Sequence, residues 1–194
     1  MSRFQQEFAP NPGLPLPRIS EDTVQQTLHD VKSAAQEERT FTAFMEKEMQ
    51  VLDSENEALA EWLKAYVAPH GDEEMRFEMI TRVLVYYRAL RKQAEGEALN
   101  TGDFDAPEKS FLPIVLGAED NIESQWPWDP SDALPFSRAQ DEHFVAFMFT
   151  LIQEENPAIF NGLKANGPDD PVSQAICGMY WLLKYHSKPR QKKE

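Results

Sequence analysis

Residues 137–156, SRAQDEHFVAFMFTLIQEEN, form the most apolar helical stretch of the chain, and we interpret the fold outward from them. Ser137 is a favoured N-cap residue, and Gln140 follows at the capping-box position, so a helix is predicted to begin here. Pro157 predicts its end at Asn156. Large apolar side chains cover nearly the whole circumference of this helix, namely Phe144, Val145, Phe147, Met148, Phe149, Leu151 and Ile152. Such a helix is predicted to lie at the centre of a domain.

An apolar seam with alternating spacings of four and three residues runs through residues 20–68, after an N-cap at Ser20. Its members are Val24, Leu28, Val31, Ala35, Met45, Met49, Leu52, Leu59, Leu63 and Tyr66. The segment is either one very long helix or two helices, and a capping box at residues 54–57 favours a break near Asp53. An exposed seam would predict a homodimer through residues 24–66, whereas a covered seam would indicate an ordinary bundle.

Four further helices are expected: residues 72–95, a segment after a cap at Ser110, a short helix from Pro157 through Leu163, and residues 172–186. The first carries a wide apolar face and matches its acidic start and basic end to the helix dipole. The pair Ile114 and Val115 leaves a short strand possible in the segment after Ser110, but no other segment alternates with period two to pair with it. The prediction is an all-α, single-domain helical bundle of six or seven helices at residues 20–186. A proline-rich extended arm (1–19) precedes it, and a basic tail (187–194) follows.

The charge balance is strongly acidic, with 33 acidic and 19 basic residues and a formal net charge of −14. A surface of this sign repels phosphate backbones and anionic lipid, so direct binding to nucleic acid or membranes is not expected. A basic protein partner would be attracted, although solubility alone also explains the charge. The N-terminal residues do not resemble a secretory signal, so a cytoplasmic location is the expectation.

No catalytic motif is present. The four histidines, at 29, 70, 143 and 186, stand on separate segments without the spacing that places two metal ligands on one helical face. The glycines form no phosphate-binding loop, and Cys177 lies in an apolar run where a small buried side chain is expected. The sequence therefore predicts neither a metal nor a cofactor, and it favours a protein that is not an enzyme.

The segment WPWDPSDALPF at residues 126–136 presents large rings between prolines. The rings of Trp126 and Trp128 either anchor a partner or fold back onto the bundle. The second interpretation is favoured because exposing tryptophan to water is costly. If a partner interface exists, these two tryptophans are its predicted anchors.

The preferred function is a non-enzymatic, acidic protein-binding protein, such as an inhibitor, an immunity-type protein, an adaptor or an assembly chaperone, that engages a basic partner surface. The predicted steering residues are Glu37, Glu38, Glu46, Glu48 and Asp53. One alternative is an acidic mimic of nucleic acid, which requires these carboxylates to line one exposed face. Another is a helical enzyme or small-ligand binder, which requires His29, His70 or His143 to meet carboxylates in a pocket.

Overall fold

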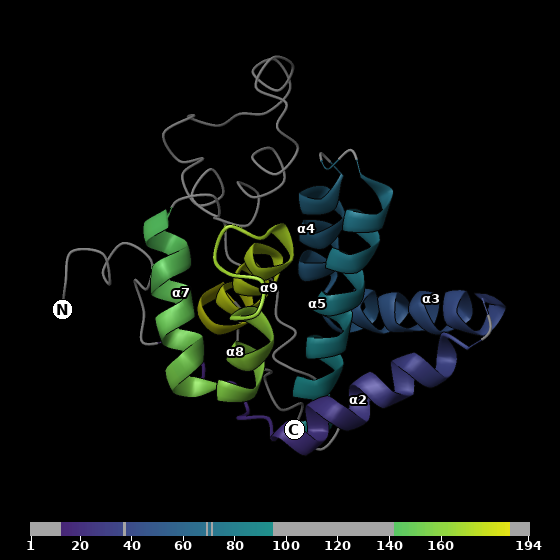
Figure 1. Ribbon diagram of the computed structural model, residues 1–194, viewed down its shortest axis with the longest axis horizontal. Coiled ribbons are helices and arrows are strands. Elements are labelled where there is room, and N and C mark those ends of the chain that lie inside the picture. The colour runs from purple at the N-terminus through teal and green to yellow at the C-terminus, as the bar shows by residue number, and fades with distance from the viewer. Residues whose placement is uncertain (1–12, 37, 69, 71, 95–141, 187–194) are drawn as a thin grey trace, which may run out of the picture.

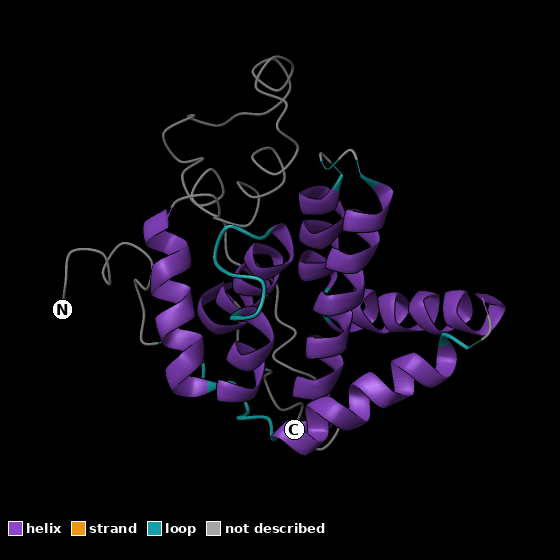
Figure 2. Ribbon diagram, in the orientation of Figure 1, coloured by secondary structure: helices purple, strands orange, loops and turns teal. Residues whose placement is uncertain are grey.

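The computed structural model describes residues 13–36, 38–68, 70, 72–94 and 142–186, and these residues form helices joined by short connections (Figures 1 and 2). Within them there are seven α-helices, one π-helical turn and no β-strand, which confirms the all-α prediction. The elements are α2 (Glu21–Ala34), α3 (Glu38–Glu55), α4 (Glu57–Val67), α5 (Glu73–Gln93), α7 (Glu142–Glu155), α8 (Pro157–Leu163), α9 (Pro171–Trp181) and η3 (Leu182–His186).

The segment 20–68 forms three helices, so the expectation of one or two was wrong. The predicted break near Asp53 falls instead at Asn56, whose Oδ1 accepts a hydrogen bond from the Leu59 N–H at 3.1 Å. Ser54 does not cap, because its hydroxyl donates to the Val51 carbonyl. A second break separates α2 from α3. Both helices contact α5, and the turn between them allows this, whereas one straight helix would carry half of the seam away from the body (Figure 1).

Most residues of the seam are buried within the bundle. Val24, Met45, Leu52, Leu59 and Leu63 are buried in the same core as α5 and α9. The seam therefore does not run as one exposed stripe along the first three helices, which is the arrangement expected of an ordinary bundle rather than of a dimer built on it.

The centre of the bundle is α9 with α5, not α7. Every residue of α9 from Ala175 to Trp181 is buried, and its most extensive contact is with α5. On α7 the buried residues form a stripe of Phe144, Val145, Met148 and Ile152, whereas Phe147, Phe149 and Leu151 are only partly buried. The predicted end of this helix at Asn156 is confirmed, and its predicted start at residue 137 lies outside the described residues.

Residues 13–19, the described part of the predicted arm, have no regular secondary structure and lead to the Ser20 cap of α2. Ile19 is buried in the core at 3% exposure. The remainder of the arm and the basic tail lie outside the described residues. Among the helices that the structure describes, none combines the length and the hydropathy that crossing a bilayer requires.

Candidate functional site

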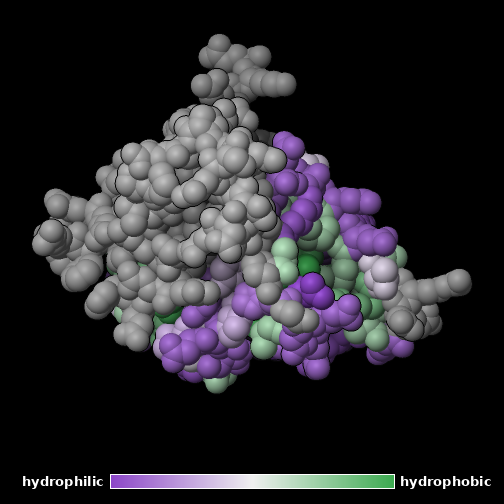
Figure 3. All heavy atoms as spheres, turned by 90° about the horizontal axis from the view of Figure 1, so that it is seen from above, coloured by the Kyte–Doolittle hydropathy of each residue, from purple (hydrophilic) through white to green (hydrophobic). Residues whose placement is uncertain are grey.

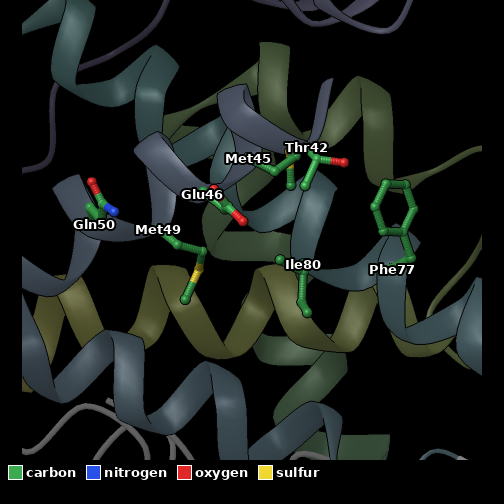
Figure 4. A pocket seen from close by; sticks show the side chains of 7 residues that line it. All are labelled: Thr42, Met45, Glu46, Met49, Gln50, Phe77 and Ile80. Carbon is green, nitrogen blue, oxygen red and sulfur yellow. The ribbon is translucent and has the colours of Figure 1, made fainter. Parts of the chain in front are cut away.

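An apolar groove opens between α3 and α5. It has a volume of about 430 Å³ and is lined by Thr42, Met45, Glu46, Met49, Gln50, Phe77 and Ile80 (Figure 4). Met45 and Met49 stand one turn apart on α3, and Phe77 and Ile80 stand three residues apart on α5, so each helix supplies one apolar wall. Methionine side chains are flexible and polarisable, and such walls adapt to the shape of what they contact.

Phe77 is the most informative residue of this groove. It is 49% exposed, and among the described residues it is the large hydrophobic side chain that the fold leaves in solvent. Its ring contacts Phe41 of α3 at a centroid distance of 5.3 Å, and this aromatic pair lies beside the groove. A hydrophobic area bordered by hydrophilic residues is visible on the α3–α5 side of the molecule (Figure 3). Exposed apolar patches rimmed by polar residues are typical of interaction sites.

The rim of the groove is polar and carries the carboxylate of Glu46. Thr42, Glu46 and Gln50 are spaced four residues apart and form one ridge along α3. Asp53 comes next on this ridge, and it pairs with Lys64 at 3.2 Å, each side chain being about half exposed. On α5 the first turn adds two exposed acids, Glu73 and Glu74, which precede Phe77 by four and three residues and so share its face.

An ion-pair cluster behind the groove holds α2 and α3 against α5. Arg88 donates to Glu48 and lies 3.4 Å from Asp30, and its guanidinium sits 5.3 Å from the centre of the Phe44 ring. Lys92 donates to Asp30 at 2.7 Å, and this hydrogen bond, the first of several causes, holds the pKa of the Asp30 carboxyl below its usual range. Three helices therefore meet at one charged junction.

A second contact of the same kind lies one turn further along α5. Arg91 pairs with Glu55 at 2.6 Å, and the Tyr87 hydroxyl donates to the same carboxylate at 3.0 Å. The two junctions bind the middle and the C-terminal end of α3 to α5, the two helices that form the walls of the groove.

The predicted steering residues do not form one exposed row. Glu46 and Asp53 are exposed on the groove ridge, seven residues apart. Glu48 is 4% exposed and committed to Arg88, so its predicted place on the exposed face is wrong. A helix turns by about 100° per residue, which puts Glu48 on the opposite side from Glu46. Glu38 lies in the first turn of α3, and Glu37 lies outside the described residues, as do the predicted anchors Trp126 and Trp128.

The histidine sites also lie apart in the fold. His29 is exposed on α2, and His70 follows α4, where its ring is 5.8 Å from that of Tyr66. His143 belongs to the first turn of α7. In the part of the chain that the structure describes, no three histidine, cysteine, aspartate or glutamate side chains come close enough to hold a metal ion.

Comparison of this chain with protein-family models, with curated proteins and with solved structures finds no match. Its function must therefore be inferred from its own residues.

Neither Phe77 nor the apolar groove beside it was predicted from the sequence. The signal was present, because Phe77 lies beside the main apolar stripe of residues 72–95 and follows a run of acids. A large ring at such a position on an amphipathic helix indicates either an extra neighbour in the fold or an exposed contact residue. Met45 and Met49 were placed in the seam, which does not reveal that a groove runs beside them.

Proposed function

We propose that this chain is a non-enzymatic protein-binding protein that holds a cationic amphipathic helix of a partner in the α3–α5 groove. The observation that carries the proposal is the half-exposed Phe77 ring beside a methionine-lined groove with an acidic rim. An amphipathic helix that enters a hydrophobic groove buries apolar side chains at intervals of three and four residues. The apolar pairs on α3 and α5 have the same spacing and would face such a stripe.

The negative charge of the chain favours a positively charged partner. The groove rim carries Glu46, and Glu73 and Glu74 lie one turn from Phe77, in a chain whose net charge is −14. Lysine or arginine residues flanking the apolar stripe of the partner would meet these carboxylates at the edge of the contact. Rim charges of this kind raise association rates and make binding dependent on salt, whereas the buried apolar contact sets the dissociation rate.

The test uses two synthetic helical peptides with the same leucine stripe, one with lysines and one with glutamates on its polar face. Fluorescence anisotropy with the full-length protein measures their affinities at about 50 and 500 mM salt. We expect the lysine peptide to bind and to weaken with salt, and the glutamate peptide not to bind. Phe77→Ser should weaken binding of the lysine peptide about tenfold or more, because a buried aromatic anchor is lost.

Two matched variants separate the groove from general acidity. Phe160→Ser removes a partly buried ring on α8, and Glu154→Gln removes an exposed carboxylate on α7, so both should leave peptide affinity unchanged. Glu46→Gln should reduce it a few-fold. Equal affinity of wild type and Phe77→Ser for the lysine peptide would refute docking in this groove, as would failure of the lysine peptide to bind at all.

A further inference from the structure

A second candidate binding site lies at the junction of α7 and α8, away from the groove. There the side chain of one asparagine forms hydrogen bonds with the backbone of the N-terminal arm. Asn156 is fully buried, and its Oδ1 accepts a hydrogen bond from the Ile19 N–H at 2.8 Å. Its Nδ2 donates to the Pro17 carbonyl at 3.1 Å. A single amide group thus pairs with the Pro17 C=O and the Ile19 N–H of the arm, in a segment that has no regular secondary structure.

Comparison with Asn56 shows that Asn156 lacks the hydrogen bond that would stabilise the start of its own helix. Both asparagines stand at the N-cap of a helix in nearly the same backbone conformation, with φ/ψ of −153°/73° at Asn56 and −137°/71° at Asn156. Asn56 caps its helix through the Leu59 N–H, whereas Asn156 makes no side-chain cap hydrogen bond. An N-cap asparagine normally stabilises the helix start by about 1 kcal/mol. Asn156 does not cap its helix, because both amide atoms form hydrogen bonds with other parts of the chain.

Groups outside the arm hold the Asn156 amide in position. Its Nδ2 also donates to the Tyr180 hydroxyl at 3.2 Å, and that hydroxyl donates to Glu155 at 3.0 Å. Glu155 in turn pairs with Lys184 at 2.8 Å, and the Lys184 side chain is 8% exposed. Burial raises the pKa of the Tyr180 hydroxyl, which keeps it protonated as a donor at neutral pH. This chain of contacts orients the receptor side without help from the arm.

The arm also contacts the turn η3. The Lys184 carbonyl accepts a hydrogen bond from the Leu14 N–H at 2.6 Å. Gly13 lies so close to this turn that an added Cβ would stand 2.8 Å from Lys184 Cγ and 2.8 Å from Tyr185 Cε1. We call Asn156, Tyr180 and Lys184 the arm seat.

The arm is held through its backbone and a few apolar side chains. The hydrogen bonds just described all go to its backbone atoms, and Ile19 is the side chain of residues 13–19 that is buried. Pro15 and Arg18 are exposed, and the other residues of that segment are half-buried. Recognition therefore combines backbone hydrogen bonds with the buried Ile19 and the partly buried Leu16, which packs against the core. A buried, pre-oriented receptor that faces a partly exposed segment has the asymmetry of a peptide-binding site, in which the segment can open locally while the receptor stays folded.

We propose that the arm seat is a binding site for an extended, proline-containing segment of another protein. Such a segment carries an aliphatic side chain two residues after the proline, and residues 13–19 occupy the seat in the free protein as a displaceable internal ligand. The proposal is independent of the α3–α5 groove. The attached arm competes at an effective concentration on the order of 1 mM. An arm with an intrinsic Kd of about 100 μM would therefore weaken the binding of any competing segment roughly tenfold.

The test uses a fluorescein-labelled peptide of residues 13–20, GLPLPRIS, and two full-length variants with a weakened arm. Ile19→Asp removes the buried anchor, and Gly13→Val adds a side chain where the backbone has φ of +74° and a Cβ has no room. We expect both variants to bind the peptide at least tenfold more tightly than wild type. The same peptide with a methyl group on the Ile19 nitrogen lacks the N–H that Asn156 accepts, and it should lose tenfold or more in affinity for both variants.

Trypsin gives a second measurement on the wild-type protein. Arg18 is exposed, but the next residue is buried and bonded to Asn156, so the bond after Arg18 is cleaved slowly while the arm is seated. A saturating peptide with glutamine in place of its arginine should accelerate this cleavage at least threefold, and the N-methylated peptide should not. Failure of both folded variants to bind the peptide, or equal binding of the N-methylated peptide, would overturn the proposal.

Discussion

A close contact between α9 and α4 gives a prediction whose size follows from the structure. Gly178 on α9 faces Trp62 on α4, and an added Cβ at position 178 would lie 2.5 Å from Cζ2 and 2.8 Å from Cη2 of the indole. Trp62 is 2% exposed and stacks on Tyr66 at a centroid distance of 5.2 Å, so its ring has little room to move. Gly178→Ala should therefore overpack this contact, and we expect the protein to lose stability.

Two opposing contributions set the size of this loss. Alanine is favoured over glycine inside a helix by about 1 kcal/mol. Overpacking a well-packed core costs about 1–3 kcal/mol, and the upper part of that range applies where the neighbouring atoms belong to a buried ring. The expected net loss is about 1–2 kcal/mol in the free energy of unfolding, measured by urea titration with circular dichroism at 222 nm. For a chain of this length the melting temperature should fall by about 2–8 °C.

Two variants identify the cause of the loss. Trp62→Phe shortens the ring, so combining it with Gly178→Ala should recover at least half of the alanine penalty relative to Trp62→Phe alone. Gly167→Ala serves as the contrast. Position 167 has φ of +86° and nothing within 4 Å of an added Cβ, so its cost of about 1–2 kcal/mol is backbone strain and should not respond to Trp62→Phe. If Gly178→Ala is as stable as wild type, the close contact of α4 with α9 is not as described.

Three further predictions concern buried and charged groups. Glu48→Gln leaves the Arg88 charge without its buried partner and should lower stability by about 1–3 kcal/mol in urea titration, whereas Glu48→Met combined with Arg88→Met should be less destabilising than either single change. Because the folded pKa of Asp30 is lowered, its contact with Lys92 should stabilise the protein above about pH 4, by at most about 1 kcal/mol. The difference in stability between wild type and Asp30→Asn should then disappear as the pH falls through the folded pKa. Complete burial raises the pKa of the Cys177 thiol, so a thiol reagent at pH 8 should modify it only as fast as the chain opens, and at once in 6 M guanidinium.

Helix boundaries that depend on local chemistry could be predicted from the sequence. Ser20 caps α2 through the Thr23 N–H, and Asp72 caps α5 through the N–H groups of Glu74 and Met75, as the residue types suggested. The end of α7 and the start of α8 follow from Pro157, which supplies no N–H and a fixed φ. These signals act within a few residues and need no information about the rest of the chain.

Positions that depend on contacts between distant helices could not be predicted in this way. The turn between α2 and α3 has no proline or glycine to mark it, and it exists where both helices reach α5. The apolar circumference of α7 suggested a central place, but α9 took it. Gly178 lets α9 approach Trp62 closely, and a helix that carries small residues among its apolar ones can be surrounded on all sides. Hydrophobicity alone does not contain this information.

The groove shows the same limit at the level of function. A seam of apolar residues at spacings of three and four indicates which face of a helix is buried, but it does not indicate which other segment covers that face. Along α3 the cover changes within two turns, since Leu52 is fully buried, Met45 is 9% exposed and Met49 is partly exposed at the groove. Phe77 extends the apolar surface from the opposite wall. The proposed docking surface is therefore a stretch of this seam that the described residues leave partly uncovered, and its position follows from the placement of α5 beside α3.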